Sequence, residues 1–298
     1  MRGRKKMITI IEQFTINLIE DGKSTNTVQS YVRDITAFLK YLGTMGVEFD
    51  GTLKRFYITS YKNYLVDNSY EPATINKKVN SIQAFNNFLV AKGYMQENVI
   101  DLKKDRVKIA IGSEHQLEVY IDNQLERIQF YIQDSKKVSL RDKIIIQILM
   151  FTGVRVSELC DIRLKNIDFL LSQIKIIGKG GKVREVPVKF EVMDTIQEYI
   201  PERNNNPYKD SEYLILGQRG VIQRDAVNTL LEKHTLKGNF EIKLKPHTFR
   251  HTFCTRLITK GIPITTVSKL AGHSSIETTA KFYINSSKED KMRAVSLL

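Results

Sequence analysis

Cysteine is scarce in this sequence. Only Cys160 and Cys254 occur among 298 residues, outside any Cys-x-x-Cys or Cys/His cluster. This pattern argues against a disulfide framework or a structural zinc site, and it favours two core thiols in a reducing compartment. Long apolar runs are also missing: none approaches the roughly 18 residues of a membrane span, and Glu12 and Gln13 interrupt the first one before it forms a signal-peptide core. We therefore expect no membrane association and a cytoplasmic location.

Acidic residues are in deficit. The chain has 33 Asp and Glu against 46 Lys and Arg, a formal net charge of +13. Such a surface attracts polyanions in a salt-sensitive way, so nucleic acid is the leading partner. Composition alone leaves a basic protein with an ordinary solvated surface as the alternative. With 42% hydrophobic residues the chain can bury a large core, and its length favours two domains.

The first part of the chain, residues 1–100, reads as a helical module. Apolar residues recur at helical spacing from Met7 to about Asn98, Pro72 marks the start of a helix, and Gly43 and Gly93 mark ends. The spacing predicts four helices, around residues 11–19, 28–42, 56–65 and 75–89. Their polar faces are either a clamp for a DNA backbone or ordinary solvated faces, and this part of the sequence alone favours neither interpretation. The basic residues on these faces are Lys23, Arg33, Lys40, Lys62, Lys77 and Lys78.

Residues 101–112 are charged and show no helical stripe, which predicts a linker. Beyond it the pattern changes. A very apolar helix over residues 144–151 stops at Thr152-Gly153, and β-prone residues 173–177 and 183–188 flank a glycine-rich turn. Helices follow. We predict a mainly α protein whose second domain, residues 113–298, combines helices with a small antiparallel sheet.

Four candidate site residues lie where helices are expected to begin. Arg155 follows the Gly153 turn, a place that favours an anion, and Glu158 can orient a neighbouring guanidinium or imidazole. His247 and Arg250, three positions apart in a helix that Pro246 begins, would share a face, as a proton donor beside a phosphate clamp. Read alone, the Arg155 motif is moderately specific, with an ordinary Arg-Glu surface pair as its alternative, and His247 and Arg250 are equally well helix-surface residues with no shared role.

His273 and Tyr283 complete the candidate set. Gly272 is expected to end one helix, and the next carries Tyr283. A single tyrosine is more often a packing residue, and its phenol, with a pKa near 10, needs nearby positive charge to act as a nucleophile. Arginine forks would stabilise charge on a phosphate without a metal ion. These motifs also hold few carboxylates, which disfavours a metal-dependent nuclease.

Five motifs occur in one order. They are Thr-Gly-x-Arg-x-Ser-Glu-Leu at 152–159, Gly-Lys-Gly-Gly-Lys at 178–182, His-x-x-Arg-His-Thr at 247–252, Gly-His-Ser at 272–274, and Thr-Thr followed by Tyr283. This pattern resembles the tyrosine recombinase (phage integrase) family, and within it the compact Xer-like members and transposon-encoded resolvases. The motifs cover most of residues 113–290, and the helical module stands where the family has its SAM-like core-binding domain.

The resemblance implies roles for these residues. Arg155 and Arg250 would bind the scissile phosphate, and His247 and His273 would assist charge stabilisation and proton movement. Tyr283 would form a covalent 3′-phosphotyrosine.

The resemblance also implies two supporting residues. Lys179 would protonate the leaving 5′-hydroxyl, and Glu158 would support the site. Lys182 competes for the acid role, but Lys179 is preferred because it directly follows Gly178 as in the family pattern.

The implied reaction is DNA strand exchange through a Holliday junction, with no cofactor and no metal. Four protomers would act on two double-stranded DNA sites, with accessory proteins possible and an association with the nucleoid through DNA. Residues 286–298 would dock into a neighbouring protomer, or else form a frayed tail.

The biological role is open between related reactions. The first helix is expected to begin within about ten residues of Met1, so we expect no separate arm-binding domain, which favours replicon dimer or transposon cointegrate resolution over arm-dependent integration. A simple phage or mobile-element integrase is the alternative. A noncatalytic DNA-binding regulator on the same fold is less favoured, because the set of catalytic residue types is complete. A type IB topoisomerase-like enzyme would share the tyrosine and arginine chemistry but relax supercoils without pairing two sites, and relaxation by a monomer would favour it.

Overall fold

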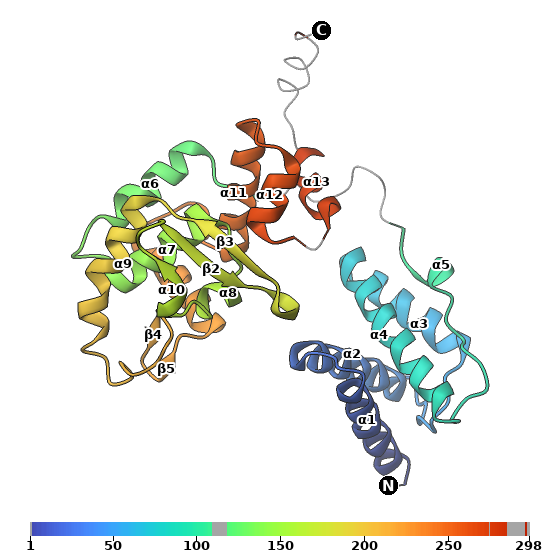
Figure 1. The fold of residues 1–298 in the computed structure, drawn as a ribbon. Helices are drawn as coiled ribbons and strands as arrows, with labels where there is room; N and C mark the ends of the chain where they lie inside the picture. The colour runs from blue at the N-terminus through green and yellow to red at the C-terminus, as the bar shows by residue number, and fades with distance from the viewer. Residues whose placement is uncertain (1, 109–117, 274, 285–295, 297–298) are drawn as a thin grey trace. The chain divides into compact units, whose positions relative to one another are not determined.

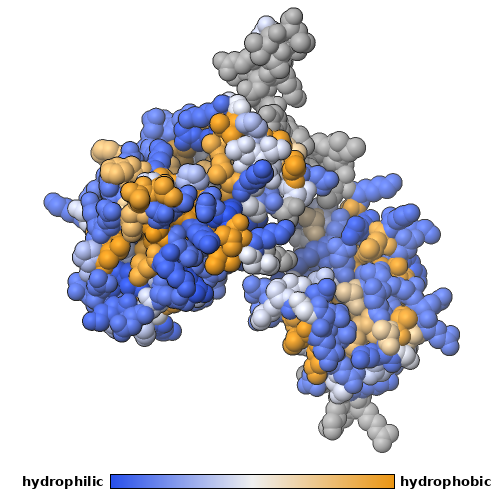
Figure 2. Space-filling model, in the orientation of Figure 1, coloured by the Kyte–Doolittle hydropathy of each residue, from blue (hydrophilic) through white to orange (hydrophobic). Residues whose placement is uncertain are grey.

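The computed structural model describes residues 2–108, 118–273, 275–284 and 296, with the backbone alone for residues 2–5, 179 and 281–284. Helices predominate, and internal contacts divide the chain into two units, Met1–Glu114 and His115–Leu298 (Figure 1). Each unit has its own hydrophobic core. Polar residues cover much of the visible face of both units (Figure 2). No helix of the described ranges is both long and apolar enough to cross a bilayer.

The first unit confirms the four predicted helices. They are α1 (Arg2–Glu20), α2 (Thr25–Thr44), α3 (Arg55–Asp67) and α4 (Pro72–Ala91). The apolar stripes meet in one core, in which Phe14 of α1 and Phe85 of α4 pack edge to face at 5.1 Å between ring centroids. Pro72 occupies the first turn of α4, where a missing N–H costs nothing.

Part of the predicted linker packs on the first unit. Residues Leu102–Asp105 form a short helix, α5, against α3 and α4, and Leu102 and Val107 add apolar side chains to the first core. The buried Asp105 pairs with Arg55 of α3. The charged residues of this segment predicted a solvated linker. The packing could not be seen in the sequence, because some of these charges form ion pairs within the first unit, as Asp105 does with Arg55.

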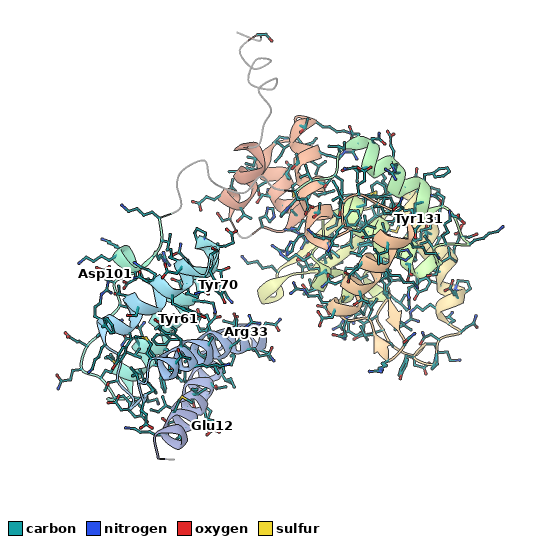
Figure 3. The ribbon with its side chains drawn as sticks, turned by 180° about the vertical axis from the view of Figure 1, so that it is seen from behind. Glu12, Arg33, Tyr61, Tyr70, Asp101 and Tyr131 are labelled. Carbon is teal, nitrogen blue, oxygen red and sulfur yellow. The ribbon has the colours of Figure 1, made fainter. Side chains whose placement is uncertain are left out.

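One predicted polar face of the first unit holds a buried carboxylate. Asp34 of α2 is 3% exposed, and Lys77 and Lys78 of α4 each place Nζ 3.3 Å from one of its oxygens. The Ser81 hydroxyl donates to Asp34 at 2.9 Å. Arg33 on the same helix is exposed instead (Figure 3). The predicted cations of this surface are therefore not equivalent.

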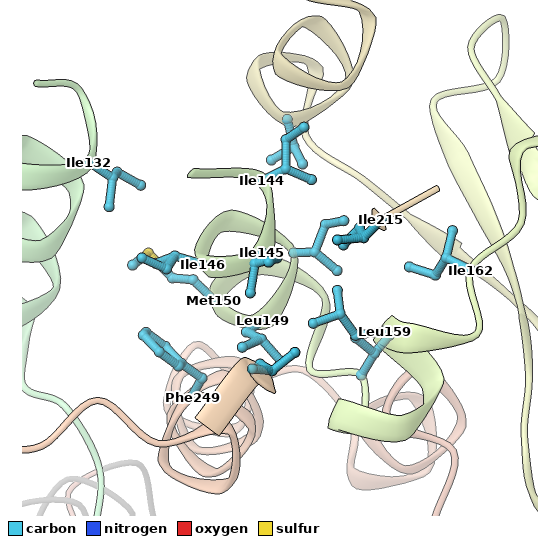
Figure 4. Packing of buried hydrophobic residues seen from close by; sticks show 14 of the residues in the cluster. Ile132, Ile144, Ile145, Ile146, Leu149, Met150, Leu159, Ile162, Ile215 and Phe249 are labelled. Atoms are coloured by element: carbon cyan, nitrogen blue, oxygen red, sulfur yellow. The ribbon is translucent and has the colours of Figure 1, made fainter. Parts of the chain in front are cut away.

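The second unit is built around one apolar helix. α7 (Leu140–Thr152) packs against α8 (Val156–Cys160), α9 (Phe190–Arg203), α10 (Arg224–Lys237) and α11 (Pro246–Thr259). Figure 4 shows Ile145 and Leu149 of α7 among Leu159 and Phe249 from its neighbours. α6 (Asp122–Ile132) adds to this core, while α12 (Ile264–Ala271) and α13 (Ile276–Ile284) pack on α11.

A small antiparallel sheet completes the second unit. Strands β1 (Ile167–Asp168), β2 (Gln173–Ile177) and β3 (Val183–Pro187) lie in that order after the 3-10 turn η1 (Leu164–Asn166). The predicted β2–β3 hairpin is confirmed, with Ile177 opposite Val183 and the turn η2 (Lys179–Gly181) at its tip. A second pair, β4 (Leu216–Gly217) and β5 (Gly220–Val221), lies apart from it. The predicted fold class, mainly α with a small antiparallel sheet, is confirmed.

Candidate active site

Arg155 lies between α7 and α8, just after the glycine turn, as the sequence predicted. Gly153 ends α7 in the left-handed region at φ 61°, and a Cβ there would stand 2.3 Å from the Phe253 ring. Arg155 then caps α8, with its backbone N–H donating to Glu158 Oε2 at 2.8 Å and Nη1 donating to Glu158 Oε1 at 2.9 Å. Its Nη2 donates to the Gly272 carbonyl at 2.9 Å. Backbone and side chain together fix this guanidinium.

Glu158 is the buried anion of the cluster, at 5% exposure. Burial alone would raise its pKa, but hydrogen bonds and positive charge from Arg184 and Arg155 hold the pKa below its ordinary value. The carboxylate is therefore ionised at neutral pH and shared between two arginines.

Arg184 is a member of the cluster to which the motifs do not point. It lies on β3, and its Nη1 and Nη2 donate to the two oxygens of Glu158 at 3.0 and 2.8 Å. A period of two along β3 places it on the same face as the buried Val186, and this alternation is the signal that could have identified it.

Arg250 belongs to the helix that begins at Pro246, as predicted. Its side chain is nearly enclosed, at 5% exposure, and Nη1 donates to the Gly153 carbonyl at 2.6 Å. Nη2 is buried and has no hydrogen-bond partner among the described residues. Burial, followed by the charge of Arg155, lowers the Arg250 pKa to about 10. A buried donor without an acceptor is costly, and an anion beside Arg250 would relieve that cost.

Burial and the charges of nearby arginines lower the pKa values of both candidate histidines, and Arg250 and Arg155 act on each. Partial burial lowers the His247 pKa, as do the charges of Arg224, Arg250 and Arg155. His273 follows the left-handed Gly272 that ends α12, and burial, then Arg250, Arg155 and Arg184, lower its pKa to about 4. Arg224, at the start of α10, is a second neighbour that the motifs miss.

One hydrogen bond and one ring contact show where the imidazole rings lie in the cluster. His273 Nδ1 lies 2.7 Å from the hydroxyl of the buried Thr279 on α13, which fixes the ring against that helix. The rings of His247 and His251 lie 6.0 Å apart between centroids, and His251 is half-buried. The structure thus brings Arg155, Arg250 and His273 into one electrostatic environment, with His247 at its exposed edge.

Two predicted site residues are described by their backbone alone. Lys179 lies in the η2 turn at the tip of the β2–β3 hairpin, and Tyr283 lies on α13, four positions after Thr279. Their side chains are outside the described part of the structure. Lys182, the competitor of Lys179, is exposed just beyond the turn. The predicted docking segment 286–298 is also outside the described residues, apart from Ser296.

Comparison with protein families decides the assignment. Residues 119–290 match the phage integrase family, and residues 11–93 match the phage integrase N-terminal SAM-like domain. The chain belongs to the tyrosine recombinase (phage integrase) family. It is a site-specific DNA recombinase, as the order of its motifs indicated.

Relatives matched over at least nine-tenths of their own length support the Xer-like type for this recombinase. It is 31% identical to the TnP I resolvase of Bacillus thuringiensis over 277 residues, with 91% of this chain and 93% of the relative covered. It is 29% identical to tyrosine recombinase XerC of Listeria monocytogenes, over 91% and 90% of the two chains, and 28% identical to XerD of Staphylococcus aureus, over 96% and 97%.

Solved structures agree on the fold. The Tn1549 transposon integrase, in complex with transposon right end DNA, covers 96% of this recombinase and 98% of its own chain with a TM-score of 0.73 at 22% identity. The XerH recombinase bound to a palindromic difH substrate covers 92% and 80% with a TM-score of 0.74 at 20% identity.

Proposed function

We propose that this recombinase cuts and rejoins double-stranded DNA through a phosphotyrosine on Tyr283. The observation that carries the proposal is the buried Arg250 Nη2, which has no partner among the described residues and belongs to the same cluster as Arg155. Two guanidinium groups held by the backbone suit the two non-bridging oxygens of a phosphodiester. Because the arginines are already oriented, little reorganisation opposes stabilisation of the transition state.

In the proposed reaction, the phenolic oxygen of Tyr283 forms a bond to phosphorus and the bond to the 5′-oxygen breaks. Lys179 supplies a proton to that oxygen, and Arg155 and Arg250 stabilise the negative charge that develops on the phosphate. His273 is neutral before DNA binds, because its pKa is about 4. A phosphate beside it offsets the arginine charges and raises its pKa, so that it can accept the proton that the Tyr283 phenol loses as the bond to phosphorus forms.

The freed 5′-hydroxyl then attacks the phosphotyrosine of a partner site, and a second round resolves the Holliday junction. We propose that four protomers act on two sites. The resolvase name of one relative and the Xer names of others favour resolution of replicon dimers or transposon cointegrates. The DNA in the titles of the similar structures supports recombination sites as the substrate. Integration by a simple phage or mobile-element recombinase is the alternative.

The nucleophile is tested with a nicked DNA site that traps the covalent adduct. We expect wild-type protein to form the adduct in EDTA, and Tyr283→Phe to bind the site normally yet form none, because phenylalanine has no attacking oxygen. Tyr208→Phe, in an exposed loop, is the matched control and should react like wild type. Adduct formation by Tyr283→Phe would place the nucleophile elsewhere.

The acid is tested by changing the leaving group. Lys179→Ala should slow cleavage of the ordinary site by about 10²- to 10⁴-fold, the usual contribution of a general acid. A site with a 5′-bridging thiol leaves without a proton, so the same variant should recover most of its rate on it. Lys182→Ala is the control and should respond equally to both substrates. Recovery by Lys182→Ala instead of Lys179→Ala would transfer the role to Lys182.

A further inference from the structure

Arg184 joins three separate segments of the second unit. From β3 it reaches Glu158 of α8 through Nη1 and Nη2, and its Nε donates to the Leu270 carbonyl at the end of α12 at 2.9 Å. Its side chain is only 14% exposed. All three guanidinium nitrogens thus donate to protein oxygens, so Arg184 serves the site through its neighbours.

The same neighbours hold the proposed phosphate ligand. Glu158 accepts from Arg155 as well as from Arg184, and Arg155 donates to Gly272, two residues beyond the Leu270 carbonyl that Arg184 holds. Arg155 and Arg184 therefore both donate to the Glu158 carboxylate and to backbone carbonyls at the end of α12. His273 follows that helix end directly.

Packing shows how closely Arg184 fits. A Cβ built on Gly272 would lie 2.6 Å from Arg184 Nη1 and 2.8 Å from its Cζ. The guanidinium thus occupies the space beside a turn that also needs a positive φ, 68° at Gly272. A lysine offers a single ammonium group and cannot reproduce a fork on Glu158 together with the bond to Leu270.

We propose that Arg184 is a positioning residue for strand cleavage, which sets the orientation of Arg155 through Glu158 and the position of His273 through the end of α12. The inference rests on the proposed function, because it takes Arg155 as a ligand of the scissile phosphate. Loss of Arg184 then misplaces groups that must meet one phosphorus atom, and displacements on the order of 1 Å cost about 10²-fold in rate.

The test compares single-turnover cleavage of two nicked sites, one with an ordinary scissile phosphate and one with a methylphosphonate. The methylphosphonate carries no charge on its non-bridging oxygen, so it requires less arginine assistance. The variants are Arg184→Gln, Arg184→Lys and Arg155→Ala. Arg163→Gln is the matched control, because Arg163 also pairs with a glutamate, Glu212, at 2.8 Å and contacts none of the proposed site residues that the structure describes.

We expect Arg184→Gln to bind DNA within about twofold of wild type and to cleave the phosphate site about 10- to 100-fold more slowly. On the methylphosphonate the defects of Arg184→Gln and Arg155→Ala should both shrink. Arg184→Lys keeps the charge and should recover part of the rate, and it carries the comparison if Arg184→Gln does not fold. Arg163→Gln should match wild type on both sites.

Two results overturn the proposal and differ in what else they affect. If the Arg155→Ala defect shrinks on the methylphosphonate while the defects of both Arg184 variants stay constant, Arg184 supports only the fold and the proposed function stands. If the Arg155→Ala defect also stays constant, Arg155 does not neutralise the phosphate, and the proposed role of Arg155 and the inference on Arg184 fail together.

Discussion

Single residues in this site hold positive charge close together before any anion arrives. Arg155 and Arg184 share the charge of Glu158, whereas Arg250 has a buried nitrogen with no partner among the described residues. Burial, followed by the charges of these three arginines, lowers the pKa of His273 to about 4, so its imidazole is neutral at neutral pH. Under the proposed function, a phosphate bound at this cluster would offset its excess of positive charge.

A pH dependence of stability follows for the DNA-free protein. The His273 pKa is about 4 when folded against an ordinary 6.5, so the unfolded chain binds more protons between these values. Its contribution to stability is thus present above pH 6.5 and is lost as pH falls from 6.5 through 4. Allowing for solvent screening, the loss is on the order of 1–2 kcal/mol.

Urea unfolding at pH 7.5 and pH 5 measures this effect. His273→Gln, which cannot be protonated, should lose less stability than wild type over the interval. Equal losses in the two proteins would show that the environment of His273 does not depress its pKa.

At the scale of elements, two members of the cluster lie at helix ends. Arg155 follows the turn that ends α7, and His273 follows the turn that ends α12. Gly272→Ala is expected to cost about 1–2 kcal/mol from the positive φ alone and to displace Arg184 as well. Gly261→Ala is the matched control: its φ is 81°, but a Cβ there meets no atom within 4 Å.

Thermal unfolding should therefore show a loss for both glycine variants, while single-turnover cleavage should fall by at least about tenfold for Gly272→Ala only. Equal cleavage rates in the two variants would mean that the contact between Gly272 and Arg184 has no part in the reaction.

Local patterns explain which elements could be predicted from the sequence. The hairpin is encoded by β-prone residues around a glycine turn, and α11 by Pro246 and the spacing of its apolar residues, so both were predictable. Contacts between distant segments were not. Arg184 meets Glu158 across 26 positions and Leu270 across 86, and Asp34 meets Lys78 across 44. No local periodicity reports such pairings, and the charges involved look solvated until the tertiary fold buries them.

At the scale of the whole molecule, the excess of positive charge belongs to both units, and the structure distinguishes two kinds of cation in the first. Arg33 is exposed, whereas the Lys78 side chain is 15% exposed and bound to the buried Asp34. A cation already paired with a buried carboxylate gains less from a phosphate, because moving it leaves an uncompensated charge behind.

DNA binding measured against salt concentration separates these roles. If α2 contacts the DNA backbone, Arg33→Gln should reduce the slope of log affinity against log salt by about one and leave urea unfolding unchanged. Lys78→Gln should instead lower stability and change the slope little, since it weakens the compensation of Asp34. A slope unaffected by Arg33→Gln would favour the ordinary solvated face over a clamp at this position. An equal reduction by Lys78→Gln would mean that Asp34 releases the lysine when DNA binds, so that the buried carboxylate holds Lys78 ready for a phosphate.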